Sequence, residues 1–168
     1  MKYEGFEDLP VWNDAIQLKL MIDEFIKYPE IARQTNLVAH MDEAGLSVSN
    51  NIAEGFERGT TNELIYFLYI ARGSAGEVRS MLRYNERRSD LAHLKSEISN
   101  LISKAESISR QLRAWADSLQ NSDIKGQRHL TDQSRAHFDQ NKRAEAFAQK
   151  IQANVQAQME ERKRKGQI

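Results

Sequence analysis

The sequence predicts an all-α protein, an up-down-up-down four-helix bundle with a further C-terminal extension that is helical or partly disordered. The 168 residues include only two prolines, Pro10 and Pro29, so most of the chain lacks the strongest helix breaker. Apolar residues recur at spacings of three and four in four successive segments, which is the period of an amphipathic helix. The connections between these segments are short, and short connections favour antiparallel neighbours in a bundle.

The first predicted helix begins after Asp8 and ends at Tyr28-Pro29. Asp8 is a suitable N-cap, and Pro10 fits the opening turn because its missing N–H group would have no helical partner there. One face of this helix is apolar, and we expect that face to lie in the core. Its members are Val11, Ala15, Leu18, Ile22 and Phe25.

The second helix is expected from about Asn36 to Arg58, with Gly59 as a left-handed C-cap. The third begins at once, because Thr60 and Glu63 have the spacing of a capping box. The turn between the two helices should therefore be short, and the helices antiparallel. We expect neighbouring helices to approach closely at three glycines, Gly45, Gly73 and Gly76.

The fourth predicted helix has an unbroken heptad pattern, in which apolar residues alternate at spacings of three and four. Ser89 or Asp90 can cap its start. The pattern suits packing against partner helices in a bundle or a coiled coil. Its members are Leu91, Leu94, Ile98, Leu101, Ala105, Ile108, Leu112, Trp115 and Leu119.

The C-terminal part of the chain differs from the rest in composition. Residues 121–133 are polar and predict a linker, and an exposed helix is expected from about Thr131 to Lys165. We therefore divide the chain into a four-helix bundle at 1–120 and a linker with a polar, basic helical tail at 121–168. The first part holds 14 Lys/Arg and 18 Asp/Glu, a charge of −4, and the second holds 10 and 6, a charge of +4. Such a tail is expected to fold back or to reach an acidic partner.

The composition excludes several kinds of site. The chain has no cysteine, which excludes disulfides, thiolate catalysis and Cys-ligated metals. The four histidines form no pair with metal-ligand spacing, and the glycines form no nucleotide-binding motif, so we expect no metal and no cofactor. The apolar runs are too short to span a membrane and the N-terminus lacks a targeting pattern, so we expect a cytoplasmic protein.

A structural polar network is expected between the second and third predicted helices. Its members are polar residues at helical spacing, Ser47, Asn51, Glu54 and Arg58 on the second helix and Ser74 and Glu77 on the third. Arg58 should be shared between the carboxylates of Glu54 and Glu77, because a buried carboxylate needs a cationic partner. A structural role is favoured over a catalytic one, since no His, Cys or second nearby carboxylate completes an acid–base pair.

Two sets of basic residues are candidates for nucleic-acid binding, because such sets can follow a phosphate backbone. The first set lies on one side of the third helix: Arg72, Arg79, Arg83 and Arg87. The second set ends the tail: Arg162, Lys163, Arg164 and Lys165. For the helical arginines, the alternative is a solvated or inter-subunit face paired with acidic residues, and it is favoured in a body that is net acidic.

Several motifs together resemble a known bacterial family. They are Phe6-Glu7-Asp8-Leu9-Pro10-Val11-Trp12, Tyr28-Pro29, Ser47-x-x-x-Asn51-Ile52-Ala53-Glu54-Gly55-x-x-Arg58 and Phe67-Leu68-x-Ile70-Ala71-x-Gly73-Ser74-x-x-Glu77. Over residues 3–120 they are similar to the four-helix-bundle proteins first met as open reading frames in intervening sequences of bacterial large-subunit ribosomal RNA genes. That family is similar in fold to the accessory protein of diversity-generating retroelements.

The resemblance implies a four-helix bundle that assembles into a ring-like homopentamer and has no established enzymatic activity. In the related retroelement accessory proteins, a positively charged pentamer binds nucleic acid and a reverse transcriptase. This chain has Asp42-Glu43 where relatives commonly carry two basic residues. The reversal weakens an inherited affinity for phosphate. Residues 121–168 extend beyond the resemblance.

These observations favour a non-enzymatic, homo-oligomeric scaffold or adaptor, expected to be a pentamer. One alternative is a nucleic-acid-binding accessory factor for RNA or DNA that acts with a reverse transcriptase. The other is an enzyme, such as a nuclease centred on Glu54 and Glu77. The expected partners are further copies of the chain, RNA or DNA, or another protein, and no membrane.

Overall fold

The computed structural model describes residues 3–121 and 132–164, and these residues form helices without any strand. The all-α prediction is therefore confirmed for the described residues. The chain divides into two compact units, Met1–Arg128 and His129–Ile168, and each is described by itself. Among the described helices, none is both long enough and apolar enough to cross a membrane.

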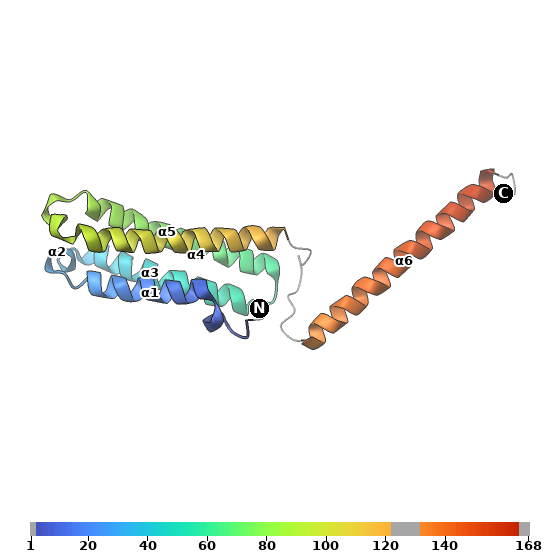
Figure 1. Cartoon of the computed structure of the whole chain (residues 1–168), viewed down its shortest axis with the longest axis horizontal. Helices are drawn as coiled ribbons and strands as arrows, with labels where there is room; N and C mark the ends of the chain where they lie inside the picture. Colours follow the sequence, from blue (N-terminus) through green and yellow to red (C-terminus); the bar gives the residue numbers. More distant parts are fainter. Residues whose placement is uncertain (1–2, 122–131, 165–168) are drawn as a thin grey trace. The chain divides into compact units, whose positions relative to one another are not determined.

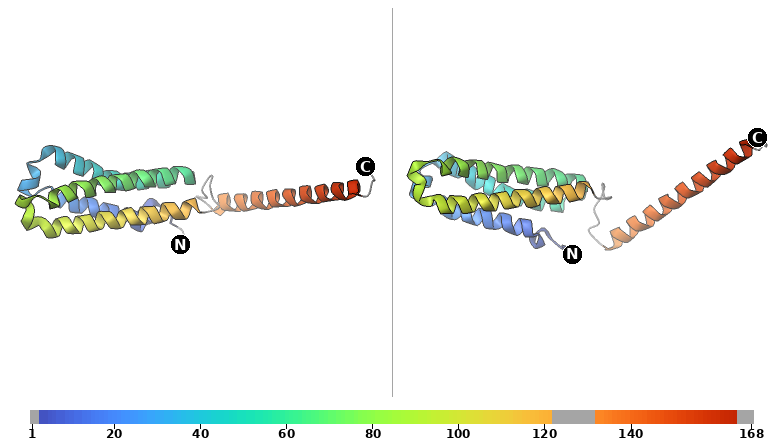
Figure 2. Two further views of the ribbon diagram at one scale, coloured as in Figure 1. Left: turned by 90° about the horizontal axis from the view of Figure 1, so that it is seen from above. Right: turned by 45° about the horizontal axis from the view of Figure 1, so that its top comes forward.

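The described part of the first unit is built from long helices that lie side by side (Figures 1 and 2). They are α1 (Pro10–Phe25), α3 (Thr35–Glu57), α4 (Thr61–Glu86) and α5 (Lys95–Gln120). Three short helices precede or join them: η1 (Phe6–Asp8), α2 (Pro29–Ala32) and η2 (Ser89–Leu94). Helices α1 and α4 each pack against both α3 and α5, so the main contacts form a closed cycle around one core.

The apolar face predicted for the first helix lies in this core. Its members, Val11, Ala15, Leu18, Ile22 and Phe25, are at most 6% exposed. Burial of these side chains, at roughly 1.5–3 kcal/mol for each large one, is the main force that holds a helix of this length in place. The amphipathic spacing was therefore a sufficient guide to the inward face of α1.

The predicted fourth helix is divided in the structure into the 3₁₀ helix η2 and the α-helix α5. Its heptad positions are buried from Leu91 to Leu112. At the end of the helix Trp115 and Leu119 are only partly buried, and Ala116 takes the core position. A straight α-helix drifts by about 20° per heptad from a strict seven-residue repeat, so the predicted seam turns out of the core over its length.

The first helix begins after Asp8 with Pro10 in its first turn, as predicted, but the prediction of Asp8 as its N-cap is wrong. The N-cap residue of α1 is Leu9, which makes no side-chain cap. Asp8 instead accepts hydrogen bonds from the backbone N–H groups of Glu4 at 2.9 Å and Gly5 at 3.3 Å. Its carboxylate thus satisfies donors at the start of η1, the short helix that the sequence pattern did not reveal.

The turn between α3 and α4 confirms one prediction and corrects another. Thr60 is the N-cap of α4, and its hydroxyl accepts the Glu63 N–H at 3.3 Å. Gly59 does not adopt the left-handed conformation that was predicted for it. The C-cap residue of α3, Arg58, is already extended, with φ −67° and ψ 138°, so the chain leaves the helix without a left-handed residue.

The glycines differ in the space around them. A Cβ atom on Gly45 would lie 2.8 Å from Cδ1 of Ile22, so α1 and α3 approach closely there as predicted. A Cβ atom on Gly73 or Gly76 would meet no atom within 4 Å. The prediction of close helix approach at these two glycines is therefore wrong, because both lie beside open space.

The second unit contains α6 (Asp132–Arg164). Its large apolar side chains are exposed, with 66% for Phe147, 47% for Ile151 and 57% for Met159. Helix α6 accounts for the described residues of the predicted tail after residue 121. Residues 122–131 of the predicted linker, and Lys165 of the basic run, lie outside the described residues.

Candidate functional site

Polar side chains link α3 to α4 near the middle of the two helices. The hydroxyl groups of Ser47 and Ser74 lie 2.9 Å apart, and Ser74 also donates to the Ile70 carbonyl at 3.2 Å. The Asn51 amide donates to the carbonyl oxygen of Ser47 at 2.7 Å and to its hydroxyl oxygen at 3.0 Å. We call Ser47, Asn51 and Ser74 the serine link. Because Ser74 is only 7% exposed, this link fixes how α3 and α4 pack.

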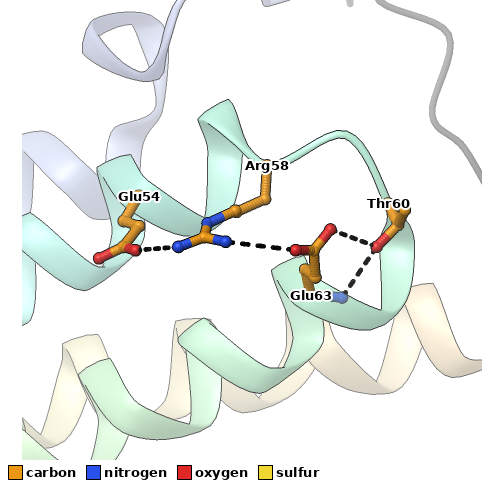
Figure 3. A network of polar contacts seen from close by, with 4 residues as sticks. All are labelled: Glu54, Arg58, Thr60 and Glu63. Atoms are coloured by element: carbon orange, nitrogen blue, oxygen red, sulfur yellow. Dashed lines mark hydrogen bonds and ion pairs between the residues drawn. The ribbon is translucent and has the colours of Figure 1, made fainter.

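Charged side chains form a separate network at the turn between these helices (Figure 3). Arg58 binds Glu54 at 2.6 Å and Glu63 at 3.4 Å, and the Thr60 hydroxyl donates to Glu63 at 2.8 Å. The guanidinium carbon of Arg58 also lies 5.2 Å from the centre of the Phe67 ring. The hydrogen bond to Glu54 raises the pKa of Arg58. We call Glu54, Arg58, Thr60 and Glu63 the turn network.

The predicted sharing of Arg58 between Glu54 and Glu77 is corrected by this geometry. The second carboxylate is Glu63, which the sequence had indicated only as part of a capping box. Glu77 lies 14 residues after Glu63 on α4, about 21 Å along the helix axis at the usual rise. The two carboxylates of the nuclease hypothesis, Glu54 and Glu77, are thus not brought together. The side chain of Glu54 is 47% exposed and is engaged by Arg58.

Basic side chains gather around a hollow of about 490 Å³ between α4 and α5. Arg72 and Arg79 line it from α4, and Arg110 and Arg113 line it from α5. Tyr69 and Glu106 also line it, and we call these six residues the arginine hollow. Gly73 lies in its wall and brings no side chain into it.

The arginines of this hollow are only partly neutralised within the chain. Glu106 accepts a hydrogen bond from Arg83 at 3.2 Å, and Arg113 lies 3.6 Å from Asp117. Within the described residues, Arg72, Arg79 and Arg110 have no ion pair and no side-chain hydrogen bond. Like charges around one hollow repel one another, so an anionic group from another molecule would be stabilised there.

The predicted stripe of arginines on the third helix is divided by the structure. Arg72 and Arg79 line the hollow, whereas Arg83 binds Glu86 at 3.0 Å as well as Glu106. Hydrogen bonds to these two carboxylates raise the pKa of Arg83. Arg87 is exposed and is the C-cap residue of α4. Of the second basic set, Arg162, Lys163 and Arg164 end α6, and Lys165 lies outside the described residues.

The sequence analysis missed the arginines of α5. Arg110 and Arg113 are three residues apart, so they share a face of a helix. That spacing was visible in the sequence. Their approach to Arg72 and Arg79 depends on the register between α4 and α5, which contacts such as Gln120 to Tyr69 at 3.2 Å and Arg83 to Glu106 reveal.

A second hollow, of about 530 Å³, lies on the other side of α4 between that helix and α3. Its polar lining consists of His40, Glu43, Ser47, Ser74, Glu77 and Ser80, and we call these residues the carboxylate hollow. The serine link forms part of its wall. In the described part of the chain, neither Glu43 nor Glu77 has an ion pair. No three His, Cys, Asp or Glu side chains of that part are grouped so as to hold a metal.

Comparison with known families identifies the first unit. The model of the 23S rRNA-intervening sequence protein family matches residues 7–114, more than half of the chain. The chain belongs to this family. The resemblance inferred from the sequence motifs is thereby confirmed. No curated protein matches the chain.

The family match includes the residues of both hollows and of the turn network, and it ends before α6. Arg110 and Arg113 lie within its last turns. The candidate binding surfaces therefore belong to the part of the chain that defines an intervening-sequence protein. Helix α6 is an addition beyond that part.

Proposed function

We propose that this intervening-sequence protein is a non-enzymatic, homo-oligomeric scaffold or adaptor. In this proposal its four long helices form an up-down-up-down bundle, and five copies assemble into a ring, as the family resemblance implies. The bundle supplies a rigid body whose outer surfaces bind other molecules. The partners are further copies of the chain and at least one other macromolecule.

The arginine hollow is the observation that carries this proposal. Arg72, Arg79 and Arg110 surround it without an acidic partner among the described residues. Arginine binds carboxylates and phosphates through two parallel hydrogen bonds, and that capacity is unused here. Surface arginines without an ion pair in the described part of their chain are suited to recognition of another molecule.

The carboxylates support binding rather than catalysis. Glu54 is engaged by Arg58, and Glu77 lies far along α4 from that pair. Catalysis by a pair of carboxylates requires both groups within reach of one reacting atom. A functional test is to assay RNA and DNA cleavage by the wild-type protein and by Glu54→Gln. The proposal expects no turnover by either, and turnover that Glu54→Gln abolishes would contradict it.

The oligomeric state tests the scaffold directly. Light scattering after gel filtration measures molar mass without a shape assumption. The proposal expects a multiple of the 19.4 kDa chain at micromolar concentration. A mass of one chain under these conditions would overturn the homo-oligomeric scaffold.

A nucleic-acid-binding accessory factor is the second candidate, and the arginine hollow also favours it. Phosphates match the guanidinium groups, and the half-exposed Tyr69 beside them offers a ring for base stacking. Anisotropy of a labelled RNA should then rise with protein concentration. The logarithm of the affinity should fall linearly with the logarithm of salt concentration, with a slope set by the number of neutralised phosphates. No binding at low salt would exclude this candidate.

A further inference from the structure

We propose that the arginine hollow of one copy binds the carboxylate hollow of the next, so that the chain assembles head to tail around α4. This inference rests on the proposed homo-oligomeric scaffold and names its interface. Three features support it: the opposite charges that line the two hollows, their shared position along α4, and the angle between the directions in which they open.

The two hollows carry charges of opposite sign that have no ion-pair partner among the described residues. Among the described residues, Arg79 and Arg110 have no acidic partner, and Glu43 and Glu77 have no basic one. Each hollow, of about 490 and 530 Å³ respectively, has room for charged side chains that a second copy brings in from its rim. Guanidinium–carboxylate bonds formed across such a contact would be charge-assisted and shielded from water.

A second copy suits the arginine hollow better than a nucleic acid does. Residues 1–120 hold 14 Lys/Arg against 18 Asp/Glu, so a body with a charge of −4 surrounds the hollow. That field repels a long polyanion along its whole length, whereas a second copy of the chain has a formal net charge of zero and is repelled less. The chain also supplies the complementary hollow itself.

Both hollows lie along the same stretch of α4, between Tyr69 and Met81. A head-to-tail contact joins two different surfaces, and it forms a closed ring only when successive copies are not shifted along the axis. A contact between hollows at different heights would give an open filament. Equal height therefore favours a ring.

The cycle of helix contacts favours a small ring. The hollows open between α3 and α4 and between α4 and α5, which are adjacent sides of a four-helix arrangement. Adjacent sides of an ideal square bundle face about 90° apart. Copies turned by about 90° close a ring of four, and copies turned by about 72° close a ring of five, so faces at nearly this angle favour a small closed ring.

Gly73 of α4 keeps the arginine hollow accessible. A Cβ atom on Gly73 would touch no atom within 4 Å. A larger residue at this position would occupy space that the proposed interface needs for the partner's carboxylates. The absence of a side chain at Gly73 thus has a use in assembly, and not in packing against the described residues.

Charge reversal tests the interface. We would measure the molar mass of Arg79→Glu/Arg110→Glu, of Glu43→Arg/Glu77→Arg, and of a chain that carries all four substitutions. Each double variant places like charges across the contact, so its mass should fall to that of the 19.4 kDa chain. The fourfold variant restores opposite charges with the sides exchanged, and its mass should return to the wild-type value. Arg87→Glu/Glu57→Arg, at exposed positions outside both hollows, is the matched control and should keep the wild-type mass.

Circular dichroism checks that each variant is folded, and Gln in place of each reversed charge keeps the test available where a reversal prevents folding. A monomeric wild-type protein would overturn both the scaffold and this interface. Wild-type mass in both double variants, or no recovery in the fourfold variant, would overturn the interface and leave the scaffold standing. Variants that stay assembled but lose RNA binding would assign the arginine hollow to nucleic acid and would likewise overturn it.

Discussion

The turn network and the arginine hollow both place charged residues beside α4, yet their charges find partners in different places. At the turn, Arg58 binds Glu54 and Glu63 within its own chain. In the hollow, Arg79 and Arg110 have no acidic partner among the described residues. Substitutions at the turn should therefore change the stability of the chain, and substitutions in the hollow should change what the chain binds.

One substitution made at both regions gives the largest expected contrast. A Cβ atom on Gly55, near the turn, would lie 2.7 Å from Cβ of Phe67, which cannot move without shifting α4. We expect Gly55→Ala to lower the free energy of unfolding by about 1–3 kcal/mol. On α4, three residues before Arg79, the added methyl group of Gly76→Ala meets nothing and the helix gains propensity, so we expect this variant to raise that free energy by about 0.5–1 kcal/mol. Urea unfolding of both variants at one protein concentration measures the two signs, and equal signs would contradict the contrast.

The serine link gives the next effect. Asn51→Ala removes both hydrogen bonds from the Asn51 amide to Ser47, and it should lower the free energy of unfolding by about 1 kcal/mol. Glu54→Ala removes the ion pair with Arg58, in which the side chains are 47% and 48% exposed. Because exposed ion pairs contribute little, this variant should lower the free energy of unfolding by less than about 1 kcal/mol. Thermal or urea unfolding ranks the two. A larger loss for Glu54→Ala would show that the turn network is more protected from water than the structure indicates.

The carboxylate of Asp14 should make the stability of the chain depend on pH. Burial acts to raise the pKa of Asp14, but hydrogen bonds from Gln111 at 2.7 Å and Lys104 at 2.5 Å outweigh it and lower the pKa below its ordinary value. A lowered pKa in the folded state contributes stability that is complete above the unfolded value of about 3.9 and is lost as pH falls through the folded value.

Asp14→Asn should therefore reduce stability at pH 7 and flatten the loss of stability in acid. Urea unfolding at pH 7 and near pH 3 gives the comparison. The control Glu57→Gln removes an exposed carboxylate that pairs with nothing in the described residues, and it should leave both values unchanged. If the free energy of unfolding of Asp14→Asn decreases between pH 7 and pH 3 as much as that of the wild type, the contact of Asp14 with Lys104 and Gln111 does not contribute to the pH dependence of stability.

Removal of residues 121–168 should have the smallest effect on assembly. Both hollows and the family match end before this segment. We expect a chain ending at Gln120 to keep the helical content of the first unit and the oligomeric state. Any affinity for RNA should fall, because the removed segment holds 10 Lys/Arg against 6 Asp/Glu. Light scattering and RNA anisotropy of the two chains measure both effects, and dissociation of the shorter chain would place part of the interface in the tail.

The sequence predicted correctly the features that depend on a single helix, such as its buried face and its capped start. The spacing of Leu18, Ile22 and Phe25 identified the buried face of α1, and Thr60 with Glu63 identified the start of α4. Local spacing suffices in these cases because helix periodicity and capping depend only on residues within a few positions.

The sequence was a poor guide to features that depend on how two helices pack, such as ion pairs and the space beside a glycine. Arg58 was assigned to the wrong second carboxylate, and Arg110 was not associated with Arg79, because the register between helices is not visible in one helix. Gly73 and Gly76 were assigned to close packing since a glycine in a helix is consistent with either a close neighbour or open space. The orientation of the neighbouring helix decides between the two, and only the structure supplies it.

A cysteine cross-link tests the central claim most directly, namely that the arginine hollow of one copy meets the carboxylate hollow of another. The chain has no cysteine, so Arg110→Cys and Glu77→Cys each introduce a single thiol. A disulfide requires Cβ atoms about 3.5–4.5 Å apart, and an arginine bonded to a glutamate through their charged ends holds its Cβ atom further from that of its partner, so a short bismaleimide is used to join the two thiols. Mixed and treated with this reagent, the two variants should give a covalent dimer that contains one chain of each kind, and neither variant alone should dimerise. Absence of the mixed dimer while the proteins remain oligomeric, or equal dimerisation of each variant alone, would contradict the account.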